Sequence, residues 1–163
     1  MSKTASSLKN LLNKWFGSNI VVGYKLLHPD AKAPHLAYAE DKGGTACFDL
    51  YSVEDKDILP YRHSEVKCGI AFEIPPYYEM ILRGRSGNAM KGIQMHFGTI
   101  DQNFRGEIGT IMYNLTPKVF KIAKGDRVCQ VAIRPVPKVK FVEKDELSVT
   151  SRGSKCFGSS GKS

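Results

Sequence analysis

Apolar and polar side chains alternate along several short segments of the chain, and this period of two limits the folds that its 163 residues can adopt. Successive side chains of an extended strand point to opposite faces, so alternation is typical of a strand with one buried face. We therefore expect half-buried strands in three places. Their apolar positions are Val66, Cys68, Ile70, Phe72 and Ile74; Ile111, Tyr113 and Leu115; and Cys129, Val131 and Ile133.

Turn-forming residues separate these predicted strands. Gly and Pro interrupt regular structure, and pairs that contain them stand between the alternating segments. Many short strands, frequent turns and no long helical pattern in the body predict an all-β fold, either an antiparallel sandwich, a barrel or a jelly roll. The turns are Gly43-Gly44, Pro75-Pro76, Thr116-Pro117 and Gly125-Asp126, and a further extended stretch runs from Ile20 to Leu27.

Both ends of the chain differ from this body. Residues 1–19 hold three Lys, no acidic residue and an apolar stripe at helical spacing, which predicts a short amphipathic helix. Packing on the body or on a neighbouring subunit is favoured for it, with membrane-surface binding, partner binding and a mitochondrial transit peptide as alternatives. Residues 148–163, rich in Ser and Gly, predict a flexible C-terminal arm, which leaves 20–147 as one β-rich domain. The apolar stripe consists of Leu8, Leu11, Leu12, Trp15 and Phe16.

The net charge of +8 favours an anionic partner, which the composition leaves open as a triphosphate, a nucleic acid or an anionic surface. Because Lys and Arg form no dense run, we expect no dedicated nucleic-acid binding. No apolar stretch has membrane-spanning length and no secretory signal is present, which predicts a cytoplasmic protein, or one in the host cytoplasm or nucleus if it is viral. The four cysteines lack CxxC spacing, which argues against a zinc site, and reduced thiols are favoured over disulfides as the alternative.

Several segments carry residues suited to a phosphate chain. Arg85, Ser86 and Gly87 offer a guanidinium group, a hydroxyl and backbone N–H groups, although an ordinary basic turn has the same composition. Asp101 follows a predicted strand in an expected hairpin over 98–107, where it would act as a general base or cap a turn. Asp49 interrupts an apolar strand, so it either orders a hydrated metal ion or is a satisfied core residue.

Two further segments are ambiguous by themselves. Gln130 interrupts an apolar strand and would face either outward or toward a ligand. The Ser- and Gly-rich segment 152–161 is either a disordered tail or a mobile phosphate clamp, in which Phe157 would stack on a base.

The order and spacing of the five segments resemble those of the trimeric dUTPase family, over about residues 20–161. The segments that correspond to the five motifs of this family are Ala46–Ser52, Arg85–Gly87, Gly98–Glu107, Gly125–Gln130 and Arg152–Gly161.

This resemblance implies a jelly-roll-like fold, a homotrimer and active sites shared between subunits. One chain would supply the first, second and fourth motifs, a second the third motif, and a third its C-terminal arm. Asp101 would activate a water molecule that attacks the α-phosphorus of dUTP, which yields dUMP and pyrophosphate. Mg²⁺ would bind mainly to the triphosphate, and Asp49 would hold waters of its shell. Such an enzyme limits uracil incorporation into DNA and supplies dUMP for thymidylate synthesis.

The resemblance also implies a set of substrate-binding residues. Arg85, Ser86, Gly87 and Gln130 would bind the phosphate chain, and Phe104 would press against the deoxyribose. The backbone of the third motif would read uracil, Phe157 would stack on it, and the rest of the arm would close over the phosphates. The uracil-reading positions are Gly98, Thr99, Ile100 and Gly109, and those of the closing arm are Arg152, Gly158, Ser159 and Ser160.

The chain departs from the family pattern at a few positions. Cys47 stands where Gly is common, Gly84 replaces Pro, Phe104 replaces Tyr, and Lys155 and Cys156 replace two glycines of the arm. The two arm substitutions predict a stiffer and more basic arm. Phe104 lacks the Tyr hydroxyl but keeps the ring that would exclude a ribose 2′-hydroxyl.

Two alternatives remain. A dCTP deaminase-like enzyme of the same fold would have a carboxylate directly after the aromatic residue, whereas this chain has Arg105 after Phe104. A nucleotide-sensing or nucleic-acid-binding regulatory module would suit the basic charge, but it has no use for a general base at Asp101.

Overall fold

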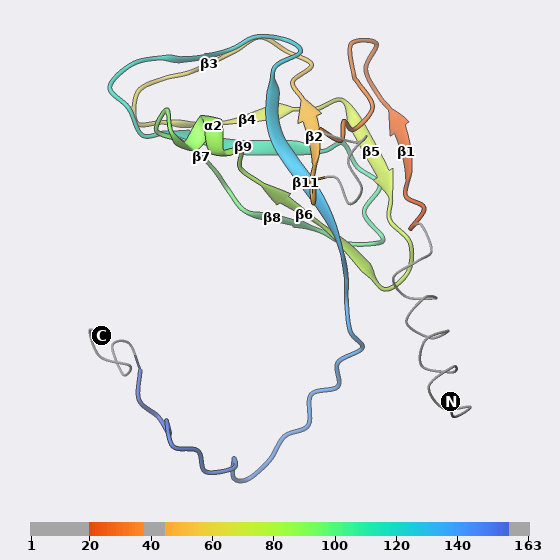
Figure 1. Cartoon of the computed structure of the whole chain (residues 1–163), viewed down its shortest axis with the longest axis vertical. Helices are drawn as coiled ribbons and strands as arrows, with labels where there is room; N and C mark the ends of the chain where they lie inside the picture. Colours follow the sequence, from red (N-terminus) through yellow and green to blue (C-terminus); the bar gives the residue numbers. More distant parts are fainter. Residues whose placement is uncertain (1–19, 38–44, 157–163) are drawn as a thin grey trace, which may run out of the picture.

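The computed structural model describes residues 20–37 and 45–156 and confirms the all-β fold class, with one short helix in this part of the chain (Figure 1). The strands before the helix are β1 (Gly23–Leu26), β2 (Phe48–Tyr51), β3 (Lys56–Ile58), β4 (His63–Lys67), β5 (Ile70–Glu73) and β6 (Tyr78–Arg83). Helix α2 (Ser86–Ala89) is followed by β7 (Ile93–Met95), β8 (Gly98–Ile100), β9 (Gly109–Asn114), β10 (Phe120–Ile122) and β11 (Arg127–Pro135).

These strands form small antiparallel sheets around a common core. One sheet has the order β2-β11-β6-β8 and another β4-β9-β7, while β1 pairs with β5 and β10 pairs with β3. Each of these sheets contributes apolar side chains to one buried cluster and so buries one of its faces. Large side chains that are fully buried in this cluster include Leu50, Ile58, Met80, Ile108 and Met112.

The segment from Val66 to Ile74 forms two strands, so the prediction of one continuous strand is wrong at Gly69. The five alternating apolar residues of this segment are buried, as predicted. Gly69 separates β4 from β5 and has a φ of 62°, a left-handed conformation that glycine adopts without strain. A Cβ there would lie 2.6 Å from Cγ1 of Val53, so close packing also requires glycine.

Strand β9 buries the face opposite to the predicted one. Ile111, Tyr113 and Leu115 are exposed, at 39%, 36% and 52%, whereas the polar side chains of Thr110 and Asn114 are buried. The Asn114 side-chain amide donates hydrogen bonds to the backbone carbonyls of Ile58, Leu59 and Lys118 at 2.9, 3.3 and 2.7 Å. These bonds offset the cost of burying a polar group, and they leave an apolar face of β9 exposed in the single chain.

Strand β11 agrees with its prediction. Cys129 and Val131 are buried and Ile133 is half-buried. The strand lies between β2 and β6 as an inner strand of the four-stranded sheet.

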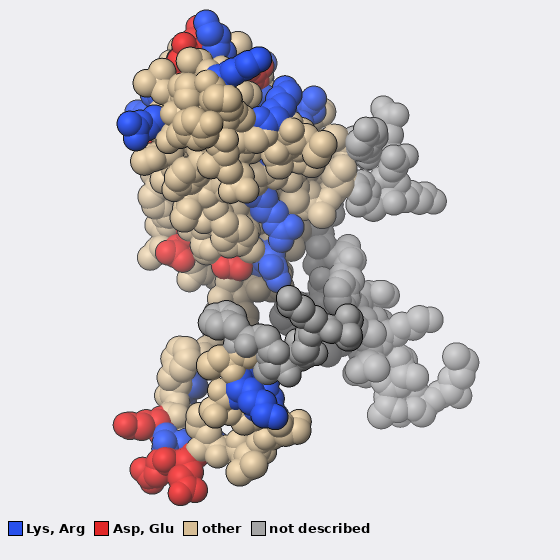
Figure 2. Space-filling model, turned by 90° about the vertical axis from the view of Figure 1, so that its left-hand side faces the viewer, with Lys and Arg blue, Asp and Glu red and all other residues tan. Residues whose placement is uncertain are grey.

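The chain leaves the body after β11. The backbone N–H of Val136 donates to the carbonyl of Tyr77 at 2.7 Å, and the chain then runs away from the sheets up to residue 156 (Figure 1). Figure 2 shows the body and this extended segment as two masses with Lys and Arg spread over the visible face. Phe141, Leu147 and Val149 of the segment are 94%, 84% and 99% exposed.

None of the helices in the described ranges is both long enough and apolar enough to cross a membrane. The predicted N-terminal helix over residues 1–19 lies outside the described residues, as do the turn at Gly43-Gly44 and the end of the arm from Phe157. The division into residues 1–19, 20–147 and 148–163 stays a prediction.

Candidate active site

Strand pairing brings together the segments that correspond to the first, second and fourth motifs. Asp49 on β2 lies opposite Gln130 on β11, and Gln130 lies opposite Arg83 on β6. The chain then passes from Arg83 through Gly84 into α2. Residues far apart in the sequence therefore meet at one end of the β2-β11-β6-β8 sheet.

Asp49 is the buried centre of this cluster, with a relative exposure of 8%. Its Oδ1 accepts a hydrogen bond from Nε of Arg85 at 3.0 Å, and its Oδ2 lies 3.2 Å from Nη1 of Arg127. Two guanidinium groups thus compensate one buried carboxylate, which would otherwise be costly to remove from water. Of the two alternatives for Asp49, the structure favours a carboxylate whose charge is satisfied by protein groups over one that orders a hydrated metal ion. Its partners, Arg85 and Arg127, are nevertheless residues that suit an anion.

Arg127 is a functional candidate that the sequence did not single out. It belongs to the fourth segment, Gly125–Gln130, but only the pairing of β11 with β2 shows that it reaches Asp49. Arg85 also donates from Nη1 to the backbone carbonyl of Arg127 at 3.2 Å, so the two arginines are fixed relative to each other.

The loop before α2 is held in the same place. Nε2 of Gln130 donates to the carbonyl of Gly84 at 2.9 Å, so this side chain faces the cluster and positions Arg85. Ser86 and Gly87 begin the helix, where backbone N–H groups have no intrahelical acceptor. A Cβ on Gly87 would meet no atom within 4 Å, which leaves open space beside these N–H groups.

We call this group the anion cradle, and it consists of Asp49, Arg85, Ser86, Gly87, Arg127 and Gln130. Guanidinium groups, a hydroxyl and free backbone N–H groups at the rim of a sheet suit the oxygens of a phosphate chain.

Asp101 is not part of the anion cradle of its own chain. It follows β8, whose Ile100 pairs with Met80 near the start of β6, whereas Arg85 comes after the end of β6. At about 3.3 Å per residue, the five residues from Met80 to Arg85 span roughly 16 Å. Asp101 is exposed and borders a separate cavity of about 280 Å³. The other residues that line it are Tyr77, Tyr78, Glu79, Gln102, Val136, Pro137 and Lys138.

The hairpin expected over 98–107 is not formed, because β8 does not pair with the strand that follows it. Strand β7 pairs with β9, with Ile93 opposite Asn114, but β8 leaves this ladder and pairs with β6 in the other sheet. Gly98 lies opposite Leu82, and a Cβ on Gly98 would lie 3.6 Å from Cβ of Leu82, which is an ordinary van der Waals contact. Gly98, Thr99 and Ile100 therefore belong to one sheet and Gly109 to another.

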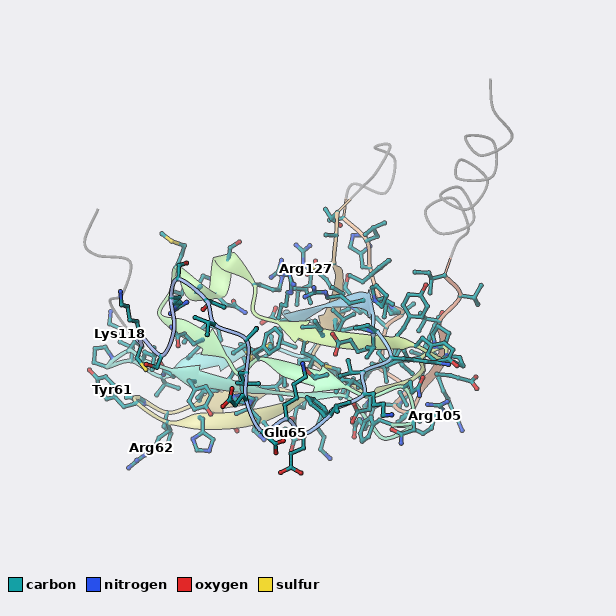
Figure 3. The ribbon with its side chains drawn as sticks, turned by 90° about the horizontal axis from the view of Figure 1, so that it is seen from below. Tyr61, Arg62, Glu65, Arg105, Lys118 and Arg127 are labelled. Carbon is teal, nitrogen blue, oxygen red and sulfur yellow. The ribbon has the colours of Figure 1, made fainter. Side chains whose placement is uncertain are left out.

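The turn after Asp101 is fixed by its own hydrogen bonds. The N–H of Phe104 donates to the carbonyl of Asp101 at 3.1 Å, and Nη1 of Arg105 donates to the carbonyls of Gln102 and Phe104 at 2.6 and 2.9 Å. The ring of Phe104 covers Gly106, where a Cβ would lie 2.5 Å from Cζ of the ring. Figure 3 shows Arg105 of this turn far from Arg127 of the anion cradle.

The arm is not in contact with either group in the described part of the chain. Arg152 is exposed, and its Nε donates to the carbonyl of Lys155 at 3.3 Å within the arm itself. Phe157, Gly158, Ser159 and Ser160 lie outside the described residues, so their predicted roles stay predictions.

Within residues 20–37 and 45–156, no group of three or more His, Cys, Asp or Glu side chains could hold a metal ion. Each oxygen of Asp49 accepts one guanidinium group, whereas a carboxylate offers about four acceptor positions. The remaining positions suit hydrogen bonds from waters of a hydrated ion, and they do not suit a site in which the protein alone binds the metal.

Comparison with known proteins gives the family. The sequence profile of the dUTPase family matches residues 30–161. A Clostridium tetani protein named deoxyuridine 5'-triphosphate nucleotidohydrolase is 43% identical over 141 residues, which cover 85% of this chain and 94% of that protein.

Solved structures agree with this match. A Staphylococcus bacteriophage 80alpha dUTPase mutant with dUpNHpp has a TM-score of 0.79 and 26% identity, covering 86% of this chain and 98% of that one. A mutant dUTPase from phage phi11 of S. aureus, described with a structural Mg(II) ion, shares the fold with a TM-score of 0.71 and 21% identity, covering 79% and 99%. The fold is the jelly-roll type of these dUTPases, and the chain belongs to the dUTPase family.

Proposed function

We propose that this protein hydrolyses dUTP to dUMP and pyrophosphate at active sites shared between the subunits of a homotrimer. The observation that carries the proposal is the anion cradle, in which Arg85, Arg127 and the start of α2 surround one buried carboxylate. By its name, the Clostridium tetani relative hydrolyses deoxyuridine 5'-triphosphate. The bacteriophage 80alpha enzyme is described in complex with the deoxyuridine nucleotide dUpNHpp. A triphosphate is a dense anion that such a cradle suits.

In the proposed reaction, the Asp101 carboxylate accepts a proton from a water molecule whose oxygen attacks the α-phosphorus. A bond forms between phosphorus and the water oxygen, and the bond from phosphorus to the oxygen that bridges to the β-phosphate breaks. That bridging oxygen leaves with pyrophosphate, and dUMP remains. The guanidinium groups of the anion cradle offset the negative charge of the phosphates during this displacement.

Mg²⁺ would bind chiefly to the triphosphate oxygens, with Asp49 accepting hydrogen bonds from its waters. The donor set described above fits this arrangement, and the phi11 enzyme is a family member described with Mg(II). When bound, the ion would stabilise negative charge on the departing pyrophosphate.

Two features support sharing of the active site. The distance from Asp101 to the anion cradle within one chain is too long for both to contact one phosphate group, so in the proposed site Asp101 would come from a neighbour. The exposed apolar side chains of β9 and of the segment after β11 would be costly to leave in water, and contact with other chains would bury them. The exchanged arm would then bring Arg152 and Phe157 to a neighbouring cradle and close it over substrate.

Substrate selectivity tests the proposed activity. We expect pyrophosphate release from dUTP in the presence of Mg²⁺, with much slower release from UTP, dTTP and dCTP. Asp101→Asn removes the base and keeps the shape of the side chain, so the rate should fall strongly while binding of a non-hydrolysable dUTP analogue is retained. Release of ammonia from dCTP would instead support the deaminase alternative.

Mixed trimers test whether sites are shared. Asp101→Asn and Arg85→Ala are each expected to inactivate a trimer composed of one variant. If each site takes its cradle and its Asp101 from different chains, random trimers co-expressed from both variants should contain about one quarter intact sites. Mixed trimers without any recovered activity would show that one chain supplies both groups.

A further inference from the structure

An apolar cavity of about 420 Å³ lies between β1 and the β2-β11-β6-β8 sheet, and nothing in the proposed reaction uses it. Neighbouring residues of a strand point to opposite faces, so Phe48 and Val131 face this cavity while Asp49 and Gln130 face the anion cradle. Its lining contains no charged residue. It consists of Ile20, Val22, Tyr24, Pro34, Phe48, Phe72, Met80, Val131 and Ile133.

The chain at the rim of the cavity is only partly packed. Val22 packs against the buried cluster, whereas Ile20 and Tyr24 are about half exposed. The described chain begins at Ile20, so the first nineteen residues are attached directly to the rim of this cavity. Phe16 and Ile20 are four positions apart in the sequence, and an extended chain spans at most about 14 Å over that length.

We propose that the N-terminal segment 1–19 docks its apolar stripe into this cavity. The stripe and the lining are both apolar and uncharged, whereas Lys14 would lie on the other side of a helix and stay in solvent. The short connection to Ile20 keeps the segment close, so little chain entropy opposes docking. The family match begins at residue 30, so this contact would be a feature of the present chain in addition to the enzyme fold.

The sequence contains one tryptophan, Trp15, and it lies in the stripe, so its fluorescence reports docking in the full-length protein. Docking predicts an emission maximum shifted to the blue and several-fold weaker quenching by acrylamide than for the unfolded chain. Emission and quenching equal to those of a fully solvated indole would overturn the proposal.

Changing the cavity should release the segment. Ile133→Lys places a charge in the lining, so the Trp15 emission should shift to the red and the quenching should rise to the solvated value. Leu59→Lys, at an exposed apolar position outside the cavity, is the control and should change neither. If Ile133→Lys leaves the emission unchanged, Trp15 is buried elsewhere and the proposal fails.

A second pair of variants leaves the folded body intact. Leu8→Ser with Leu12→Ser removes part of the stripe and should release Trp15, whereas Asn10→Ser with Asn13→Ser changes the opposite side and should not. If segment 139–149 of another chain filled the cavity instead, Trp15 would be solvated in the unmodified protein. That result would also overturn the proposal.

Discussion

Asp49 organises the anion cradle through a charge arrangement that involves only three side chains. Each of its oxygens faces one guanidinium group, so Arg85 and Arg127 are held side by side although both are positive. Repulsion between the two arginines would separate them without the carboxylate. A triphosphate would bind to arginines that are already oriented, which reduces the ordering cost of binding.

Asp49→Asn tests this role. The amide keeps the size of the side chain but loses the charge, so Arg85 and Arg127 should spread apart. Because a hydrogen bond to a charged group contributes about 1.5–3 kcal/mol, we expect kcat/KM for dUTP to fall about 10- to 100-fold. Asp30→Asn is the control, since Asp30 forms an ion pair with Lys124 at 2.9 Å on the exposed surface. An unchanged kcat/KM for Asp49→Asn would refute the role.

The cysteines should differ sharply in reactivity, because their surroundings differ. A hydrogen bond with the Cys68 thiol, and then burial, raise the pKa of the Cys129 thiol well above its ordinary value. The protonated thiol is a poor nucleophile, and its burial blocks access of a reagent. Iodoacetamide at neutral pH should therefore label the exposed Cys156 quickly, and Cys68 and Cys129 only after unfolding. Mass spectrometry of peptides checks this, and rapid labelling of Cys129 in the folded protein would contradict it.

At the scale of elements, Asn114 connects three parts of the chain. Its side-chain amide donates to the carbonyl of Ile58 at the end of β3 and to the carbonyl of Lys118 in the loop before β10. Its Oδ1 accepts a hydrogen bond from the hydroxyl of Thr116 at 2.8 Å. These bonds explain how β9 can bury Asn114 on the same face as Met112, with Ile111 and Tyr113 on the exposed face. The apolar residues of β9 are thus free to contact another chain.

Asn114→Ala should destabilise the fold strongly. The fully buried amide would be lost together with one buried and two partly buried hydrogen bonds to backbone carbonyls. Because a buried unsatisfied group costs about 1–3 kcal/mol, we expect the free energy of unfolding to fall by about 3 kcal/mol. Urea denaturation measures this change. Asn88→Ala is the matched control, because Asn88 makes a single long side-chain bond of 3.5 Å to Val128. A loss no larger than that of the control would show that solvent replaces the Asn114 bonds.

At the scale of the whole molecule, two apolar surfaces remain uncovered in the single chain. One is the outer face of β9, and the other is the segment after β11, with Phe141 and Leu147. Together with the separation of Asp101 from the anion cradle, they support the proposed assembly of several chains.

Ile111→Lys tests this assembly. A charge at the centre of the β9 face would be costly to bury against another chain, so the trimer should dissociate and dUTP hydrolysis should be lost with it. Val119→Lys is the control, because Val119 is exposed to a similar extent, 42% against 39%, but lies outside β9. Light scattering measures the molar mass. A trimeric and active Ile111→Lys protein would exclude β9 from the interface.

The sequence by itself determined the all-β class, most strand positions and the residue types of the anion cradle. Alternation between apolar and polar residues is a local property, and the conformation of a strand depends on local sterics and on the burial of one face. The segments with Arg85, Asp49 and Gln130 were ambiguous one by one, and only their order and spacing along the chain made them recognisable.

Only the tertiary structure decided which faces are buried, where a strand breaks and which functional residues meet. Gly69 breaks a strand because Val53, distant in sequence, occupies the space of a Cβ, and β9 inverts its faces because Asn114 finds buried carbonyl partners. Arg127 joins Asp49 only through the pairing of β11 with β2, and Asp101 is separated from both by the length of β6. Each of these outcomes depends on contacts between distant segments, which no local pattern contains.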